Sequence, residues 1–317
     1  MILKKGLVRL LKCIICTNDF EKLSDEHIFP DAIGGSLIVG NVCKSCNSKL
    51  GDEIDSLLTN HFLISLIRNS QGISGKSGTV PNPFKEGVTE DGQKVRLLMS
   101  EDGQFLPQYV PQLSEIAENR LRIVVDSKDF SSLPDIIRKT SKRKGVDIPE
   151  QEIQEIISNV VIESSQPKIN YDFAIDTEKY KKALLKIAYE MGVYWLGDKY
   201  IEDPIGQELR TLIFSSIDDL RKSKIHGKIG LASEIKKFPF FNIKELAGMH
   251  LAILILDGNR LSIILRIFDV FAASIVLSEN SDKYQIDDQG YFMFLDPVER
   301  IYNEMSFIEA IKLYMRH

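Results

Sequence analysis

All four cysteines of this chain lie within its first 46 residues, as Cys13-Ile-Ile-Cys16 and Cys43-Lys-Ser-Cys46. Each Cys-x-x-Cys pair can form a tight knuckle that presents two thiolates to one ion, and two pairs supply the four ligands of a tetrahedral zinc site. Buried free thiols are a weaker explanation, because they do not account for two identical pairs. A thioredoxin-like redox motif occurs singly between a strand and a helix. The spacing therefore predicts a small zinc-stabilised module.

The segment between the two pairs is longer than in a plain zinc ribbon. It contains Asp25-Glu26-His27, Pro30 and Gly34-Gly35, and the second pair continues into Asn47. Here the chain resembles the HNH endonucleases, whose ββα-metal finger has an acidic residue before a His, a Pro three residues later, a Gly-Gly turn, and a Cys-x-x-Cys followed by His or Asn at the head of a helix. The resemblance covers about residues 10–60.

The resemblance implies two metal sites with different roles. A structural zinc would be held by the four thiolates of Cys13, Cys16, Cys43 and Cys46. A catalytic divalent metal, Mg²⁺ or Mn²⁺, would be held by Glu26 and Asn47, with His27 as the general base. The implied activity is hydrolysis of phosphodiester bonds, with DNA as the expected substrate.

The chemistry of these residues supports the same roles. Phosphodiester hydrolysis needs a deprotonated water and a cation on the developing charge, and an imidazole with an ordinary pKa of about 6.5 can act as the base near neutral pH. Carboxylate and amide oxygens suit Mg²⁺. Adjacent residues of a strand point to opposite faces, so Glu26 and His27 can share one site only where the strand bends or ends. Pro30 and Gly34-Gly35 favour such an ending.

The rest of the chain is expected to be mixed α+β. We expect a nuclease module over residues 1–68, a Gly-, Ser- and Pro-rich linker or long loop over residues 69–92, and an α+β domain of unknown role over residues 93–317. The patterns predict strands at 96–99, 121–126, 271–278 and 291–295, a hairpin with strands at 251–256 and 261–265, and helices at 130–144, 150–160 and 177–196.

A final helix is predicted from apolar residues that recur at three- and four-residue spacing near the C-terminus. They are Ile301, Met305, Ile308, Ile311 and Tyr314.

The charge balance gives no general attraction to nucleic acid, because 40 Lys and Arg stand against 45 Asp and Glu, a net charge of −5. Any contact must therefore be local. The densest basic cluster lies within residues 138–144, where a basic helix end before Gly145 is an equally good explanation. The candidate contacts are Lys49, Arg68, Lys76, Arg138, Lys139, Lys142, Arg143 and Lys144.

Membrane insertion is not expected. The longest apolar runs, at 251–256 and 271–277, fall short of the roughly 20 residues that span a bilayer. Arg9 and Lys12 interrupt the N-terminal apolar stretch before a signal-peptide core could form, so we expect a cytoplasmic protein.

The sequence leaves three alternatives for function. The first is an HNH endonuclease that cleaves DNA, the second is a zinc-finger DNA-binding or adaptor protein without hydrolysis, and the third is a nuclease that acts on RNA. The larger domain is expected to supply substrate grip, regulation or dimerisation, and a homodimer would place two single-metal sites on opposite strands.

Overall fold

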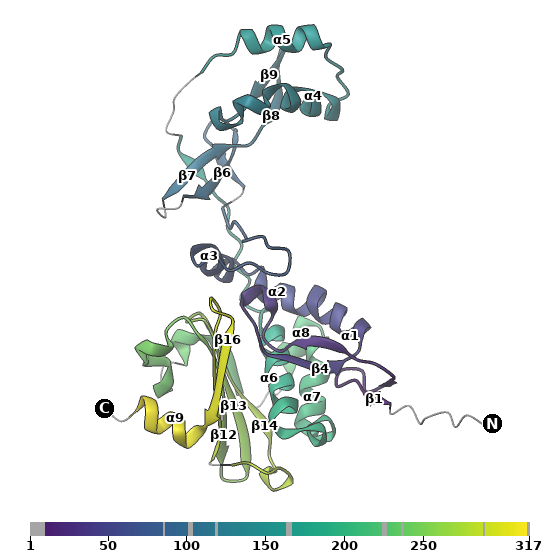
Figure 1. Cartoon of the computed structure of the whole chain (residues 1–317), viewed down its shortest axis with the longest axis vertical. Helices are drawn as coiled ribbons and strands as arrows, with labels where there is room; N and C mark the ends of the chain where they lie inside the picture. Colours follow the sequence, from purple (N-terminus) through teal and green to yellow (C-terminus); the bar gives the residue numbers. More distant parts are fainter. Residues whose placement is uncertain are drawn as a thin grey trace, which may run out of the picture. The chain divides into compact units, whose positions relative to one another are not determined.

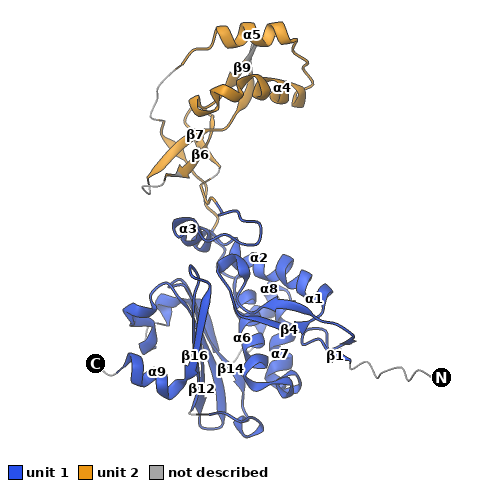
Figure 2. Cartoon of the chain, viewed as in Figure 1, with its two compact units in different colours: residues 1–81, 175–317 blue, residues 82–174 orange. Residues whose placement is uncertain are grey.

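The computed structural model describes residues 10–84, 86–100, 104–117, 120–162, 167–223, 227–235, 238–287 and 289–315. The chain divides into two compact units, coloured separately in Figure 2. Unit 1 joins residues 1–81 to residues 175–317, and unit 2 consists of residues 82–174. This division differs from the boundaries expected at residues 68 and 92, because the N-terminal module shares one hydrophobic core with elements that follow residue 174.

The N-terminal module of unit 1 consists of two antiparallel hairpins and a helical segment. Strand β1 (Leu11–Lys12) pairs with β2 (Asp19–Phe20), and β3 (Ser24–His27) pairs with β4 (Ile38–Val42). The helical segment comprises α1 (Lys44–Lys49), the π-helical turn η2 (Leu50–Asp55), α2 (Ser56–Thr59) and α3 (Phe62–Ser70). Leu50, Ile54 and Leu58 are buried, as their helical spacing predicts.

The centre of unit 1 is a six-stranded antiparallel sheet in the order β11-β14-β13-β12-β15-β16. Its strands are β11 (Gly227–Leu231), β12 (His250–Asp257), β13 (Arg260–Ile267), β14 (Phe271–Ser278), β15 (Gly290–Asp296) and β16 (Ile301–Ser306). The predicted hairpin is confirmed: Asp257 lies opposite Arg260, and Gly258 adopts the left-handed backbone that the turn requires (φ +61°). These helices and sheets confirm the α+β class.

Helices cover both faces of this sheet (Figure 1). Helices α6 (Lys181–Leu196) and α7 (Pro204–Ile213) pack on the face that presents Ala252 and Leu254, and α8 (Ile217–Lys222) follows them. Helix α9 (Phe307–Tyr314) and the short turns η6 (Pro239–Asn242) and η7 (Lys244–Leu246) cover the face of Leu251 and Ile253. Burial on both faces explains the unbroken apolar run at 251–256, because neither set of alternating side chains meets water.

Unit 2 contains a four-stranded sheet, a separate hairpin and two helices. The sheet has the order β10-β5-β6-β7. The two helices of unit 2 form a small hydrophobic core that contains Leu133, Ile137 and Ile153. The elements are β5 (Gly87–Thr89), β6 (Lys94–Met99), β7 (Phe105–Tyr109), β8 (Gln112–Ala117), β9 (Arg120–Val124), α4 (Leu133–Arg143), α5 (Glu150–Ser158) and β10 (Ile169–Asn170).

The predicted final helix is wrong in its first part. Residues 301–306 form the edge strand β16, in which Ile301 is 60% exposed and Met305 lies opposite Phe292. The helix starts only at Phe307, where Ser306 forms a capping box with Glu309. The helix predicted over 177–196 likewise begins later, at Lys181. Among the described residues, no helix combines the length and the apolar character needed to cross a membrane.

A buried histidine bonds the sheet to the N-terminal module. His250, the first residue of β12, is 0% exposed, and its Nε2 lies 2.8 Å from the Ile33 carbonyl oxygen. Its Nδ1 accepts the N–H of Phe268 at 3.1 Å. A neutral imidazole protonated on Nε2 satisfies both bonds. Burial lowers the pKa of His250 to about 4.

We expect unit 1 to lose stability as the pH falls from 6.5 to about 4. In this window the unfolded chain binds a proton at residue 250 and the folded chain does not, so the free energy of unfolding falls with the pH. The difference between the two pKa values corresponds to about 3 kcal/mol. Urea unfolding followed by the fluorescence of Trp195, the single tryptophan, measures this dependence in unit 1. His250→Gln should flatten it, and equal pH slopes in both proteins would contradict the assignment.

Candidate functional site

The four cysteines come together in one cluster. Their sulfur atoms all lie within 4.8 Å of one another, and the Sγ atoms of Cys16 and Cys43 are 3.9 Å apart. Tetrahedral Zn–S bonds of about 2.3 Å require sulfur separations of about 3.8 Å, and the Cys16–Cys43 separation is close to this value. The backbone N–H of Cys43 also donates to Cys13 Sγ at 3.3 Å. The cluster is compatible with a structural zinc.

The protonation of the thiols also bears on zinc binding. Burial raises the pKa of Cys13 and of Cys46, so without a cation both thiols stay protonated at neutral pH. Zinc binds the thiolate form and releases the protons. We therefore expect the cluster to bind zinc more weakly as the pH falls.

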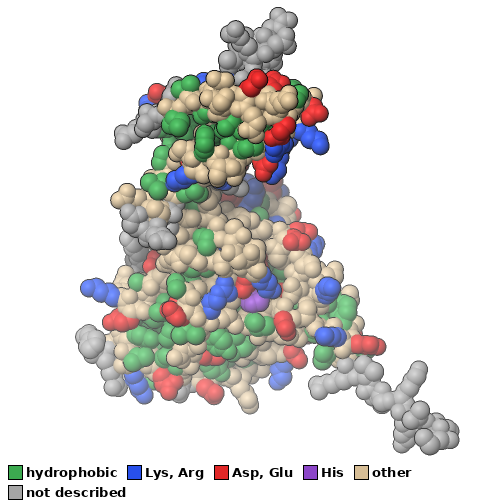
Figure 3. All heavy atoms as spheres, turned by 45° about the horizontal axis from the view of Figure 1, so that its top comes forward, with side chains coloured by type: hydrophobic (Ala, Val, Ile, Leu, Met, Phe, Trp, Pro, Cys, Tyr) green, Lys and Arg blue, Asp and Glu red, His purple; other side chains and the backbone are tan. Residues whose placement is uncertain are grey.

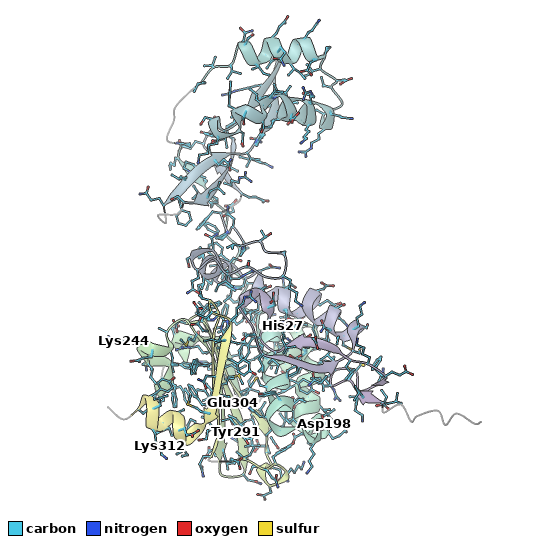
Figure 4. All side chains as sticks on the ribbon, viewed as in Figure 1. His27, Asp198, Lys244, Tyr291, Glu304 and Lys312 are labelled. Carbon is cyan, nitrogen blue, oxygen red and sulfur yellow. The ribbon has the colours of Figure 1, made fainter. Side chains whose placement is uncertain are left out.

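His27 lies at the end of β3 (Figure 4). The ladder with β4 pairs His27 with Ile38, and the backbone then continues through Pro30 into the turn η1 (Asp31–Ile33). The imidazole is 16% exposed, and burial together with the charge of Lys76 lowers its pKa below the ordinary value. At neutral pH the ring is therefore uncharged and can accept a proton. In Figure 3 histidine atoms reach the surface beside Lys or Arg and Asp or Glu side chains.

Asn47 joins the helical segment to the histidine strand. Its side-chain Nδ2 donates to the carbonyl oxygen of Asp25 at 2.6 Å, two residues before His27. This bond uses the nitrogen of the amide, and the amide oxygen is the atom that could ligate a metal. Helix α1 and strand β3 are thereby held together.

Comparison with known families identifies this segment. Residues 13–63 match the family model described as HNH endonuclease. Within these residues the chain is similar to the HNH endonucleases. The match contains both cysteine pairs, His27 and Asn47, and it makes nucleic acid the substrate class of the HNH module. The chain matches none of the curated proteins and none of the solved structures with which it was compared.

Glu26 leaves β3 of the HNH module on the opposite face from His27. Its carboxylate is 5% exposed, and Oε1 lies 2.7 Å from Nζ of Lys186 on helix α6. The strand ending expected to bring the two side chains together is therefore not observed: both residues stay in the ladder, the imidazole lies at the module's surface and the carboxylate in its interior. The Glu26 carboxylate is already paired with a cation of the chain.

Lys186 lies at the centre of a buried cluster of charges. Its ammonium group is also 3.1 Å from Glu190 Oε2 and 3.5 Å from Asp55 Oδ1. Burial alone would lower the pKa of Lys186, but Asp55, Glu190 and Glu26 raise it above the ordinary value, so the lysine stays charged. Burial raises the pKa of Asp55 to about 6 and that of Glu190 well above its ordinary value. Burial thus favours the protonated form of Glu190 and lowers the negative charge that faces Lys186.

A second contact from the C-terminal half holds the loop after His27. Asp31 Oδ1 lies 3.9 Å from His27 Nε2, and it accepts a hydrogen bond from Nη1 of Arg300 at 2.9 Å. Arg300 Nη2 also donates to the carbonyl oxygen of Ser74 at 2.6 Å. The turn between β15 and β16 thus fixes the carboxylate beside the imidazole.

Sterics require glycine at both positions of the Gly-Gly turn in the HNH module. Gly34 has φ +85°, and a Cβ there would lie 2.2 Å from the carbonyl oxygen of Pro297. A Cβ on Gly35 would lie 1.7 Å from the carbonyl oxygen of Phe29. Both positions therefore require glycine, because the loop packs directly against backbone.

The basic residues proposed as nucleic-acid contacts differ in their surroundings. Lys76 is exposed, and its charge acts on His27. Lys49 lies 4.4 Å from the ring centroid of Phe214 and 3.9 Å from Glu53. Arg68 is 5% exposed and donates to the Thr59 carbonyl oxygen, so its guanidinium faces the interior of the module in this structure.

The basic cluster of unit 2 lies on and just after α4. Arg138 forms a bidentate pair with Glu150 and a further bond with Asp135, so its charge is already neutralised. Four basic residues of the cluster are exposed and remain predicted contacts: Lys139, Lys142, Arg143 and Lys144.

Four residues near the site were missed in the sequence. Asp31 follows the histidine by four positions, and Lys186 and Glu190 form an i,i+4 pair of charges inside an otherwise apolar helical pattern. That interruption of the apolar face was a usable signal. No sequence signal indicated Arg300, because only the fold brings this residue to Asp31.

Proposed function

We propose that the protein is a metal-dependent endonuclease that hydrolyses phosphodiester bonds of DNA, with His27 as the general base. The observation that carries the proposal is the uncharged, partly exposed imidazole of His27 within the segment that matches the HNH family. A base of this kind takes a proton from the attacking water, which raises the rate by about 10²- to 10⁴-fold.

Glu26 and Asn47 are the proposed ligands of the catalytic Mg²⁺ or Mn²⁺. When bound, such an ion would neutralise charge on the phosphate and keep open positions for its oxygens. Asn47 retains its amide oxygen for this role, because its nitrogen carries the bond to Asp25. Glu26 Oε1 is paired with Lys186, and a carboxylate has a second oxygen that can ligate an ion.

The strongest competing function is a zinc-finger DNA-binding or adaptor protein without hydrolysis. The observation that favours it is the pairing of Glu26 with Lys186, which gives the carboxylate a cation without any metal. A nuclease acting on RNA is the third candidate. Unit 2 is proposed to bind the substrate through its exposed basic residues Lys139, Lys142, Arg143 and Lys144. A homodimer and a cytoplasmic location remain expectations.

The three candidates separate in one comparison of substrates. Zinc-loaded protein is incubated with plasmid DNA and with structured RNA, each with Mg²⁺, with Mn²⁺ or with a chelator. Metal-dependent cleavage of the plasmid supports the proposal, and cleavage of RNA alone assigns the third candidate. Binding of DNA with neither substrate cut assigns the non-catalytic candidate and overturns the proposal.

A further inference from the structure

Lys186 is the group near the site that the resemblance to HNH endonucleases leaves unexplained. It reaches the end of β3 from helix α6, far along the chain from the HNH module. We propose that Lys186 is a positioning residue of the nuclease, which holds the Glu26 carboxylate and the His27 backbone in the geometry for cleavage. This inference rests on the proposed function, in which Glu26 is a metal ligand and His27 the base.

The contacts of the ammonium group are divided between the module and its own helix. The closest oxygens are the His27 carbonyl at 2.6 Å, Glu26 Oε1 at 2.7 Å and Glu190 Oε2 at 3.1 Å. A protonated lysine has three N–H donors, so these contacts can use all of them. Two of the three closest partners therefore belong to the two adjacent residues that carry the proposed chemistry.

The His27 carbonyl lies where β3 loses the support of its ladder. His27 is the last residue of β3 paired with β4, and one more backbone bond follows, from the Ile28 N–H to the Leu37 carbonyl at 3.2 Å. Pro30 then has no N–H to donate. Lys186 bonds the His27 carbonyl and also lies 3.2 Å from the Ile28 carbonyl, so it fixes the peptide that determines where the imidazole points.

Helix α6 is a rigid support for this lysine. Leu185 and Ile187, on either side of Lys186, are both 0% exposed, and the helix packs on the central sheet. A group on a packed helix holds its partners more closely than a group on a loop. The π-helical turn of the module brings Asp55 to the same ammonium, and such turns are frequent at functional sites.

Stability alone does not require a buried cluster of charges at this position. Burying ion pairs is costly because each charge loses its water, and well-packed apolar residues often serve equally well. Lys186→Met alone leaves Glu26 and Glu190 buried without the lysine, which is destabilising, whereas replacing Lys186 and Glu190 together removes both charges from the helix. A methionine cannot donate the hydrogen bonds that hold the Glu26 carboxylate and the His27 carbonyl in place.

The test compares Lys186→Met with Lys182→Met in the full-length, zinc-loaded protein. Lys182 lies one turn earlier on α6, and its ammonium bonds the Ser215 carbonyl instead of the module. The readouts are kcat and KM for plasmid cleavage with Mn²⁺, together with zinc content and thermal unfolding. We expect kcat of Lys186→Met to fall about 10- to 100-fold while KM stays nearly constant. Lys182→Met should keep the wild-type kcat, and a folded Lys186→Met with that same kcat would overturn the proposal.

A second variant keeps the proposal testable if Lys186→Met does not fold. Lys186→Met/Glu190→Leu removes the lysine together with the carboxylate of its own helix, and Glu190→Gln is its control. Loss of kcat in the folded double variant, with Glu190→Gln active, supports the proposal. If neither lysine variant folds while Glu190→Gln does, Lys186 serves the fold alone and the proposal is overturned.

Hydrogen exchange separates this inference from the proposed function. Exchange at residues 24–29 should become faster in the lysine variant that folds than in Lys182→Met, while strands β12 to β14 keep their protection. Unchanged protection at residues 24–29 would contradict the positioning role whether or not the wild type cleaves DNA. Absence of wild-type cleavage, by contrast, would overturn the proposed function and the catalytic part of this inference, while faster exchange at residues 24–29 would still show that Lys186 fixes the end of β3.

Discussion

Replacing Cys43 with Ser is expected to abolish zinc binding and to unfold the HNH module. Structural zinc contributes on the order of 10–16 kcal/mol to small fingers, and a serine oxygen is a poor substitute for the thiolate. Cys43 and Cys13 also belong to the core shared with α6, so the damage should reach the rest of unit 1. Metal analysis and thermal unfolding measure both effects, with about 1 zinc per chain expected in the wild type.

The matched control is Ser48→Ala, an exposed serine in α1 two residues after the second cysteine pair. This variant should bind zinc and unfold at the wild-type temperature. Folded wild-type protein without zinc would show that the cluster is not a structural metal site.

His27→Ala is expected to lower the cleavage rate by about 10²- to 10⁴-fold while the protein remains folded. The substitution removes the imidazole but no zinc ligand, and it leaves the bond between Arg300 and Asp31 in place. Plasmid cleavage under single-turnover conditions measures the loss. Equal zinc content and equal thermal unfolding exclude misfolding as its cause.

Asp19→Ala serves as the control for substitution in the module, because Asp19 is an exposed residue of the β2 strand. Its rate should equal that of the wild type. Full activity of His27→Ala at neutral pH would remove His27 from the mechanism.

The local parts of this structure were predictable from the sequence. The two Cys-x-x-Cys pairs predicted the cluster that the fold brings together, and unbroken apolar runs around Asp257-Gly258 predicted the central hairpin. These features depend on residues close in sequence. The final helix was predicted too long because Ile301 and Met305 match a helical period, whereas pairing with β15 makes residues 301–306 a strand.

The division into units depends on contacts between distant residues. The HNH module shares its core with α6 and bonds to His250 and Arg300, and no local pattern reveals such partners. For this reason residues 82–174 could not be recognised as a unit inserted between the two parts of unit 1. A fragment that ends near Gly92 would lack α6 and the central sheet.

The candidate site was predictable as a set of residues but not as a geometry. Motif order selected Glu26, His27 and Asn47. The strand ending that was expected to bring Glu26 and His27 to one face is not observed, because both residues stay in the ladder with β4 and their side chains alternate. The partner of Glu26 could not be predicted, since Lys186 is 160 residues away in the sequence.

The most direct test of the account is the metal dependence of plasmid cleavage at constant zinc content. Zinc-loaded wild-type protein is treated with a mild chelator, its zinc is measured, and conversion of supercoiled plasmid is followed before and after addition of Mg²⁺ or Mn²⁺. The account predicts that cleavage stops while about 1 zinc per chain is retained, and that it returns with either ion, because an ion held by one or two protein oxygens binds more weakly than a zinc held by four thiolates. Folded, zinc-loaded protein that leaves the plasmid intact at every concentration of Mg²⁺ and Mn²⁺ would contradict it.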